Sequence, residues 1–467
     1  MSAHFGMIGL GTMGRNLVLN MADHGFEICG FDKDPKQQAN LKTEGQGKAV
    51  SVAASLEELV QTLQTPRVVM LLVPAGHIVD AVIKDITPLL QKGDVLIDGG
   101  NSHFMDTARR YESLQSDGVH YIGMGVSGGE DGARYGPSLM PGGNRESYDI
   151  VVKILQAIAA KSDEGPCVTY IGNTASGHYT KMVHNGIEYA LMQLISEVYD
   201  ILKNIGGLNN KELHDLFSLW NNSELQSFLV QITADIFLQQ DAETGKDLVD
   251  IILDKARQKG TGMWTSQSAM ELNVPTPVID SAVTMRYLSS MKEERVSTAE
   301  NMQINFSEDK PVDKTSLIEL CKGALIFGQA LSYGQGLHLL AIASANYDYK
   351  INIAEVIRIW KGGCIIRSAM LNDLRKAYLD DVTLVNIIQS PIFKQRFLQH
   401  RDAVASIVQL AAQHHIPVAC LSATLNYFDA YCSRQLPANL IQAQRDYFGA
   451  HTYERIDKTG HFHTEWN

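Results

Sequence analysis

Five side chains that can do chemistry occur within residues 181–189, in the stretch KMVHNGIEY. In a helix of about 100° per residue, one side would carry all five, namely Lys181, His184, Asn185, Glu188 and Tyr189. A polar stripe of this kind is usually a solvated face, but the residues between are apolar and the helical pattern continues to about residue 207. Because buried polar groups must be paired or functional, we expect the catalytic groups on this face.

The elements that position this helix divide into three parts along the chain. Residues 1–176 alternate short apolar runs with helical patterns, which predicts an α/β domain with a Rossmann-like, doubly wound parallel sheet. The six runs are HFGMIGLG, FEICGFD, RVVMLLV, DVLIDGG, VHYIGMGV and CVTYIG. Residues 177–434 lack strand signals and predict a large all-α domain, and residues 435–467 form a C-terminal tail whose aromatic content suggests docking.

The helical part carries signs of an internal duplication at a separation of 140 residues. Ala190-Leu191 aligns with Ala330-Leu331 in two long predicted helices, and Leu219-Trp220 aligns with Ile359-Trp360 in the shorter helices that follow. The polar, charge-rich segment 292–315 would join the two copies.

The composition is typical of a soluble enzyme and excludes several other classes. The chain has 467 residues, of which 45% are hydrophobic, and no apolar run approaches the ~20 residues that span a bilayer. No signal peptide precedes the first predicted strand, and the net charge of −12 argues against nucleic acid as a partner. The six cysteines have no CxxC spacing, so we expect reduced core thiols in a cytoplasmic protein, without disulfides or a metal site.

The motif Gly9-Leu-Gly11-Thr-Met-Gly14 follows an apolar strand and opens a helical pattern. The next strand ends at Asp32, 18 residues after Gly14. This register predicts a dinucleotide site in which the pyrophosphate lies against the helix N-terminus.

The residues after the second strand bear on the choice between NAD and NADP. Asp32 can accept hydrogen bonds from a ribose 2′-hydroxyl, which favours NAD, and would repel a 2′-phosphate. Lys33 could neutralise that phosphate, while Asp34 adds further negative charge. These residues leave the choice open, with a slight preference for NAD.

Two glycine-rich segments follow later strands, and a set of cations lies beyond them. Asp98-Gly-Gly-Asn101-Ser102 and Gly125-Val-Ser127-Gly128-Gly129-Glu130 occur at carboxyl ends of predicted strands, where such folds bind ligands. Cations suited to a phosphorylated substrate are Lys259, Arg286, Arg445 and His451. Each glycine-rich segment alone is equally explained by a turn, and a lone arginine is more often a solvated charge than a ligand.

Several segments resemble the decarboxylating 6-phosphogluconate dehydrogenases, over essentially the full length of the chain. They are GLGTMGRNL, LIDGGNS, GMGVSGGEDGA with GPSLMPGG, KMVHNGIEYALMQLI, KGTGMWTSQSA and PANLIQAQRDYFGAHTYERIDKTGHFHTEW. The last two are specific to that family, whereas the wider 3-hydroxyacid dehydrogenase superfamily shares only the first four in looser form. The resemblance implies conversion of 6-phospho-D-gluconate to D-ribulose 5-phosphate and CO₂ with reduction of NAD(P)⁺, as in the pentose phosphate pathway, without a metal.

The resemblance also implies residue roles. Lys181 would be the base at the C3 hydroxyl, and Glu188 would protonate C1 after decarboxylation. The substrate contacts that it implies are Asn101, Ser127, Gly128, Gly129, His184, Asn185, Tyr189, Lys259, Arg286, Arg445 and His451. The cofactor contacts that it implies are Gly9, Leu10, Gly11, Thr12, Met13, Gly14, Asp32, Lys33, Asp34, Val73, Pro74, Ala75 and Asn101.

The resemblance further implies a homodimer in which Arg445 and His451 reach the partner's site through the tail. Two departures from the family pattern fall in the cofactor region. The family commonly has Asn-Arg-Thr, which binds the 2′-phosphate, where this chain has Asp32-Lys33-Asp34, and Pro74 stands where many relatives have lysine or glutamine. We therefore expect NADP by family habit, or NAD as Asp32 suggests.

Two other functions remain as alternatives. One is another β-hydroxyacid dehydrogenase, such as a 3-hydroxyisobutyrate dehydrogenase-like enzyme with an unphosphorylated substrate, against which Lys259, Arg286 and Arg445 argue. The other is a non-catalytic nucleotide-binding sensor, against which Lys181 and Glu188 argue. Assays with 3-hydroxyisobutyrate and with 6-phosphogluconate distinguish the three.

Overall fold

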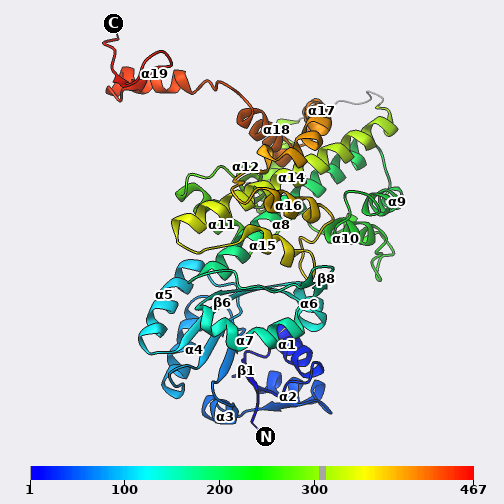
Figure 1. The fold of residues 1–467 in the computed structure, drawn as a ribbon. Helices are drawn as coiled ribbons and strands as arrows, with labels where there is room; N and C mark the ends of the chain where they lie inside the picture. The colour runs from blue at the N-terminus through cyan, green and yellow to red at the C-terminus, as the bar shows by residue number, and fades with distance from the viewer. Residues whose placement is uncertain (1, 304–311, 467) are drawn as a thin grey trace.

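A computed structural model describes residues 2–303 and 312–466, with an α/β part beneath a helical part in Figure 1. The sheet has seven strands in the order β3-β2-β1-β4-β5-β6-β7. Their bounds are β1 Phe5–Ile8, β2 Ile28–Phe31, β3 Val50–Val52, β4 Val68–Leu71, β5 Val95–Asp98, β6 His120–Ser127 and β7 Ser138–Gly143. Strands β1 to β6 pair in parallel, in the strand order of a dinucleotide-binding sheet, and β7 adds an antiparallel edge.

The sequence prediction was wrong at two places in this sheet. The run CVTYIG (167–172) is not a strand, and isolated bridges at Val168 and Gly172 join it to β7. Strands β3 and β7 were missed, and β7 (SLMPGG) contains a proline and two glycines that ordinarily argue against a strand. Pro141 is tolerated because β7 has a full strand partner on one side only.

Helices cover both faces of the sheet, so its strands are buried on both sides and have continuous apolar sequences. Along β4, Val68 and Met70 enter one core and Val69 and Leu71 enter the other. The helices of this part are α1 Thr12–Asp23, α2 Pro35–Glu44, α3 Leu56–Thr62, α4 His77–Ile86, α5 Phe104–Ser116, α6 Gly129–Tyr135 and α7 Arg145–Ile158. A short hairpin, β8 Lys161–Ser162 and β9 Gly165–Pro166, follows α7.

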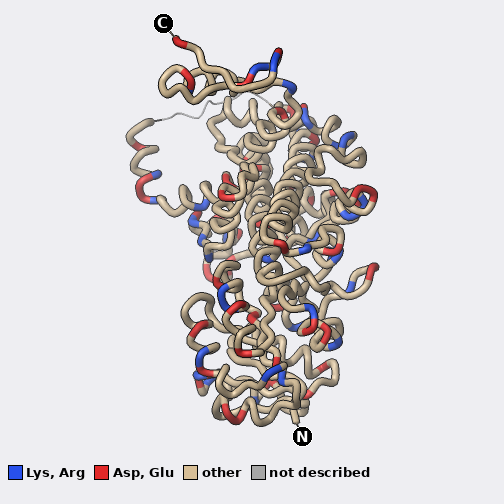
Figure 2. Tube along the Cα trace, turned by 60° about the vertical axis from the view of Figure 1, so that its left-hand side comes forward, with Lys and Arg blue, Asp and Glu red and all other residues tan. Residues whose placement is uncertain are grey.

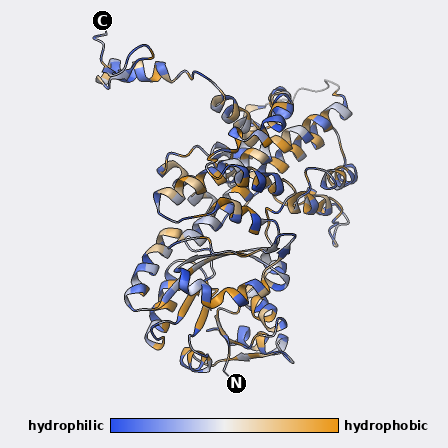
Figure 3. Ribbon diagram, viewed as in Figure 1, coloured by the Kyte–Doolittle hydropathy of each residue, from blue (hydrophilic) through white to orange (hydrophobic). Residues whose placement is uncertain are grey.

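The second part is helical and shares one continuous hydrophobic core, visible in Figure 3 as orange on the inner helices. Its helices are α8 Ser176–Asn204, α9 Asn210–Asn221, α10 Phe228–Phe237, α11 Thr261–Glu271, α12 Pro277–Ser290, α13 Lys292–Met302, α14 Lys314–Asn346, α15 Ile353–Trp360, α16 Met370–Asp380, α17 Pro391–Gln413 and α18 Ala419–Tyr431. The long helices α8 and α14 pack against each other at its centre. Charged residues lie mainly around the outside, and the central helices are mostly tan in Figure 2.

The helix order supports an internal duplication. Adding 140 to the bounds of α12 gives 417–430, close to those of α18, and adding 140 to α9 gives 350–361, close to those of α15. The predicted joining segment 292–315 contains α13 and the start of α14, and its residues 304–311 lie outside the described part of the chain.

The chain ends in a tail that stands away from the body in Figure 1. It contains α19 Ala438–Gly449 and a small hairpin, β10 Tyr453–Glu454 and β11 His461–Phe462. The six cysteines are unpaired, five of them buried and Cys432 exposed. Among the described residues, no helix combines the length and hydrophobicity needed to cross a membrane.

Candidate active site

A cavity of about 500 Å³ opens where β1, β2 and β4 end, at the point where the strand order reverses. Gly9 has a φ of +95°, and a side chain there would collide with the Leu72 carbonyl. A Cβ at Gly14 would collide with the Gly9 carbonyl, whereas one at Gly11 would meet open space. Helix α1 starts at Thr12 without a side-chain cap, so its first N–H groups are available to an anion. The residues at the predicted motif therefore fit a pyrophosphate.

Asp32 is engaged by the protein's own backbone. Its carboxylate accepts hydrogen bonds from Leu10 N–H at 2.6 Å and from Asp34 N–H at 2.9 Å. The side chain of Asp34 points to the backbone as well, since it caps α2 by accepting from Lys36 N–H. Asp32 thus ties the glycine loop to the end of β2, and its remaining lone pairs face the cavity that it lines.

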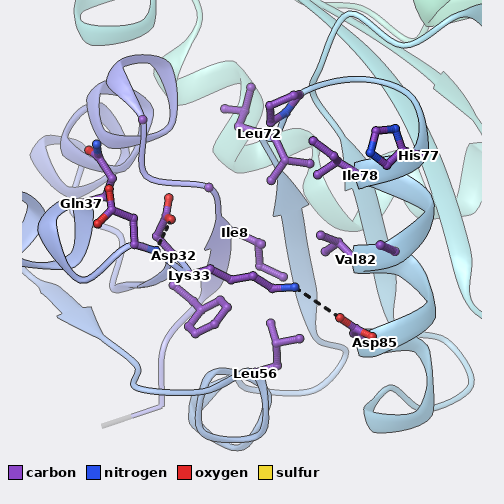
Figure 4. Close-up of a pocket in the computed structure, with 17 residues that line it drawn as sticks. Ile8, Asp32, Lys33, Gln37, Leu56, Leu72, His77, Ile78, Val82 and Asp85 are labelled. Atoms are coloured by element: carbon purple, nitrogen blue, oxygen red, sulfur yellow. Dashed lines mark hydrogen bonds and ion pairs between the residues drawn. The ribbon is translucent and has the colours of Figure 1, made fainter.

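Lys33, which lines the same cavity, is paired with an acidic residue. Its ammonium reaches across the cavity to Asp85 of α4, at 3.6 Å, as Figure 4 shows. Three carboxylates (Asp32, Asp34 and Asp85) and one lysine therefore line the region expected to hold the adenosine ribose. The local charge is negative, which favours a ribose hydroxyl over a phosphate.

A buried arginine that the sequence analysis missed holds the two loops beside this cavity. Arg110 of α5 is only 2% exposed and donates to Asp80, to the Gly76 carbonyl and to Ser102. Ser102 in turn donates to Asp98 at 2.6 Å. The loop that contains Val73, Pro74 and Ala75 is thereby fixed relative to the loop that contains Asn101.

Glycines allow α8 to begin directly on the sheet. A Cβ at Gly177 would collide with the carbonyls of Gly123 and Met140, and a Cβ at Gly125 would collide with the Lys181 side chain. Helix α8 therefore crosses β6 and β7 at close range, and Lys181 lies over β6. This contact places the reactive face of α8 next to the carboxyl edge of the sheet.

Lys181 is buried on this face, whereas the side chain of Glu188 is 22% exposed. Burial lowers the pKa of Lys181, and the attraction of Glu188 only partly opposes that shift. Burial raises the pKa of Glu188, against the opposing effects of Lys181 and Arg286. Each shift favours the neutral form of its group. Together they increase the fraction of sites that hold a neutral Lys181 amine and a protonated Glu188 at neutral pH.

His184 connects this face to the glycine-rich end of β6. Its Nε2 lies 3.2 Å from Ser127 Oγ, and its Nδ1 lies 3.1 Å from Asn185 Oδ1. Because an amide oxygen only accepts, Nδ1 carries the hydrogen and Nε2 accepts from the serine. Burial holds the pKa of His184 well below its usual value, so the ring is neutral. Asn185 also donates to Thr261 of α11 at 3.1 Å, which joins a third element to the site.

Cations border the far end of the same face. The Arg286 guanidinium lies 3.5 Å from the centre of the Tyr189 ring. Lys259 is exposed in the loop just before Thr261. Arg286 also donates to the Arg257 carbonyl at 3.0 Å, so the structure places Arg286 on Tyr189 and links it to the loop that contains Lys259. It does not bring Arg445 or His451 there, because both lie in the tail, away from the body of the same chain.

Comparisons with known proteins match both parts of the chain. The model for the NAD binding domain of 6-phosphogluconate dehydrogenase matches residues 4–172, and the model for the C-terminal domain of that enzyme matches residues 177–466. The chain is 50% identical to the decarboxylating 6-phosphogluconate dehydrogenase of Synechococcus elongatus, covering 99% of each. It is also 50% identical to the NADP(+)-dependent enzyme of Bacillus subtilis, covering 99% of this chain and 98% of the relative.

A solved structure agrees. Plasmodium falciparum 6-phosphogluconate dehydrogenase, described in its apo form and with NADP⁺ or 6-phosphogluconate, superposes with a TM-score of 0.96. It is 41% identical, covering 99% of this chain and all of the other. This chain belongs to the 6-phosphogluconate dehydrogenase family.

The structure also shows one wall of the candidate site that the sequence analysis missed. Trp360 packs edge-on against His184, with ring centres 5.6 Å apart. A Cβ at Gly128 would collide with the Gly363 carbonyl, which accepts a hydrogen bond from Ser138 N–H at 2.8 Å. The segment 360–364 thus supports Ser127 and His184 from behind, and the glycine pair at its centre was the only signal in the sequence.

Proposed function

We propose that this chain catalyses the oxidative decarboxylation of 6-phospho-D-gluconate to D-ribulose 5-phosphate and CO₂, with NADP⁺ or NAD⁺ as the oxidant. The observation that carries the proposal is the pair of buried Lys181 and partly exposed Glu188, each with its pKa shifted toward the neutral form, beside a dinucleotide cavity. The names of relatives that cover 99% of the chain support it. We further propose the division into a dinucleotide-binding domain (1–176), a helical domain (177–434) and a tail (435–467).

The proposed chemistry needs one base and one acid at different carbons of the substrate. The bound dinucleotide supplies the hydride acceptor. Neutral Lys181 takes the proton of the C3 hydroxyl as hydride leaves C3, and the resulting 3-keto acid loses CO₂ because the ketone is β to the carboxylate. Protonated Lys181 then hydrogen-bonds to the enolate oxygen, and Glu188 delivers its proton to C1 of the enediol, which was C2 of the substrate. Helical spacing supports this division, since seven residues separate the two groups by about 10 Å along the axis.

The remaining residues of the site hold the two ends of the substrate in this proposal. The sugar-acid end lies against Asn101, Ser127, Gly128, Gly129, His184 and Asn185. The phosphate end lies against Tyr189, Lys259 and Arg286, where arginine suits bidentate binding. Arg445 and His451 complete the phosphate site from a second copy of the chain.

The tail supports the homodimer in this proposal. Helix α19 exposes Leu440, Ile441, Tyr447 and Phe448, the last with 72% of its surface accessible in the single chain. Monomeric proteins rarely expose apolar residues in such a cluster. A tail that stands away from its own body and carries an apolar face is suited to bury that face on a partner subunit.

An assay of the purified chain tests the function. With 6-phosphogluconate and either dinucleotide, we expect stoichiometric formation of NAD(P)H, CO₂ and ribulose 5-phosphate. Turnover of 3-hydroxyisobutyrate instead would favour the other dehydrogenase class, and no reduction with either substrate would favour a non-catalytic sensor.

Removing the tail after Pro437 is expected to raise the KM for 6-phosphogluconate by about tenfold or more, since phosphate-binding cations are charge-assisted contacts. The truncated chain should also dimerise more weakly, because its apolar face is lost. Steady-state kinetics and sedimentation velocity measure the two effects. A folded truncation with an unchanged KM would exclude the tail from the site.

The cofactor preference is expected to differ from that of an enzyme strictly dependent on NADP⁺. Because three carboxylates outnumber Lys33 at the rim, we expect NAD⁺ to be used at least comparably to NADP⁺. Asp32→Asn should shift kcat/KM several-fold toward NADP⁺, since apposed charges at exposed sites contribute about 1 kcal/mol.

Asp85→Asn provides a matched variant for the cofactor prediction. It removes a negative charge and releases Lys33 without touching the glycine loop. It should shift the preference in the same direction while kcat/KM for NAD⁺ stays close to that of the wild type. A wild-type preference for NADP⁺ above about a hundredfold, equivalent to nearly 3 kcal/mol, would contradict the proposed effect of these charges.

A further inference from the structure

One carboxylate is buried inside the otherwise exposed tail. Asp446 of α19 has no accessible surface, although its neighbours Arg445 and Tyr447 are exposed. It accepts four hydrogen bonds, from Thr452 N–H, His463 Nδ1, Thr464 N–H and Trp466 Nε1, all between 2.9 and 3.0 Å. Burial alone would raise the pKa of Asp446, but these hydrogen bonds lower it to about 2, so the group is ionised at neutral pH. The ionised side chain joins α19 to the last residues of the chain.

The same aspartate shapes the backbone around His451. The residues on either side, Ala450 and Thr452, have φ values of +47° and +60°, which residues other than glycine seldom adopt. Asp446 holds both of them, since its carbonyl accepts from Ala450 N–H and its carboxylate accepts from Thr452 N–H. Two strained residues on either side of one position persist only where the surroundings fix them. The turn that presents His451 therefore depends on Asp446.

Gln442 extends this arrangement to Arg445. Its amide nitrogen donates to the Thr452 carbonyl, and its amide oxygen accepts from Arg445 Nη1 at 3.2 Å. Thr452 is thus held at its N–H by Asp446 and at its carbonyl by Gln442. Arg445 and His451, the two tail residues proposed to bind phosphate, share one hydrogen-bonded support that belongs entirely to the tail.

We infer that Asp446 is a positioning residue for substrate binding: it pre-forms the tail so that Arg445 and His451 enter the partner's site as one rigid unit. This inference rests on the proposed function. Without the support, the turn that carries His451 and the side chain of Arg445 would lose conformational freedom when substrate binds, which weakens affinity without changing any contact atom. Asp446 thus acts on the affinity for the phosphorylated end, at a distance from the reacting carbons.

Asp446→Asn is the discriminating variant. Asparagine keeps the size of the side chain, but its NH₂ group cannot accept from Thr464 N–H and Trp466 Nε1, so two of the four hydrogen bonds are lost. We expect the KM for 6-phosphogluconate to rise by about tenfold while kcat changes by less than about threefold, because only preorganisation is lost. Kinetics are measured at concentrations where sedimentation shows the dimer.

Asp457→Asn is the matched control, since Asp457 lies in the same tail and pairs only with exposed Arg455 among the contacts seen in the described residues. Its kinetics should match the wild type. Gln442→Leu provides a second variant that removes the contacts to Thr452 and Arg445, and the KM should rise with it as well.

A double-mutant comparison separates positioning from a general loss of stability. In a background of Arg445→Met with His451→Ala, Asp446→Asn should add less than about twofold to the KM, because the residues it positions are already gone. An additive effect would overturn the inference. The inference would also be overturned if Arg445→Met with His451→Ala raises the KM but Asp446→Asn alone leaves it unchanged. If the variant Arg445→Met with His451→Ala itself has a normal KM, the tail does not bind the phosphate. That outcome refutes the proposed phosphate role of the tail and, with it, the role of Asp446.

Discussion

Replacing Lys181 with Met is expected to lower kcat by at least about 100-fold, the usual size of a general-base contribution, while dinucleotide binding is retained. Methionine keeps the length and apolar bulk of the side chain, which lies over β6 against Gly125. The dinucleotide cavity is lined by residues before Leu90 in the chain, so its binding does not depend on position 181. Steady-state kinetics and dinucleotide titration by fluorescence measure the two quantities.

Lys203→Met is the control for this prediction, because it makes the same change on the same helix at the end remote from the sheet, where Lys203 pairs with Asp250. Its turnover should stay close to that of the wild type. If Lys181→Met retains more than a tenth of the wild-type turnover, Lys181 is not the base.

Glu188→Gln is expected to reduce steady-state turnover by about 100-fold while the first equivalent of NAD(P)H still forms. The amide cannot donate a proton to C1, so the enediol accumulates after oxidation and loss of CO₂. A rapid-mixing experiment should therefore show a burst of reduced dinucleotide followed by a slow phase. Normal rates in both phases would assign the protonation to another acid.

The same variant should remove one limb of the pH profile. Burial raises the pKa of Glu188 and favours the protonated acid, which the proposed protonation of the enediol needs. Activity should therefore fall as the pH rises through the pKa of Glu188, and this basic limb of kcat should be absent in Glu188→Gln, which has no such proton to lose. Because the protonated acid carries no charge, the acidic limb, where Lys181 takes up a proton, should stay close to that of the wild type. A basic limb that persists unchanged in Glu188→Gln would contradict its assignment to Glu188.

Glu197→Gln is a matched control for both Glu188 experiments. Glu197 is a buried carboxylate of α8, about 13 Å further along the axis, and it accepts from the N–H groups of Cys420 and Leu421. Burial raises its pKa to about 7. Its replacement should affect stability, because it caps α18, but should show neither the burst nor the loss of the basic limb expected for Glu188→Gln.

Local periodicity was sufficient to predict helix α8 and the burial of part of its polar face, while the catalytic role of that face stays a prediction. Five polar residues at helical spacing among apolar ones determine both the helix and its buried side, and the structure places Lys181 and His184 in the interior. The glycine loop after β1 could be predicted equally well from the sequence. Its order of strand, turn, helix and acidic residue is contained in about thirty residues.

Other parts of the site depend on contacts that no local pattern records. Arg109 and Arg110 are adjacent in sequence, yet Arg109 is 58% exposed and Arg110 is buried among Asp80, Asp98 and Ser102. Only the packing of α5 on the sheet distinguishes them. The wall at Trp360 and Gly363 lies some 170 residues from His184, and strand β7 is hidden by its proline and glycines.

The repeated helices have a consequence for the descent of this enzyme. The positions of α14 that correspond to the reactive face of α8, 140 residues further on, are Cys321, Ala324, Leu325, Gly328 and Gln329. All five are buried in the helical core, and a side chain at Gly328 would press on Leu194 of α8 itself. If the two long helices descend from one ancestral helix, they have diverged unequally. Helix α8 presents Lys181, His184 and Glu188 at these positions, whereas the matching residues of α14 pack in the core and support α8.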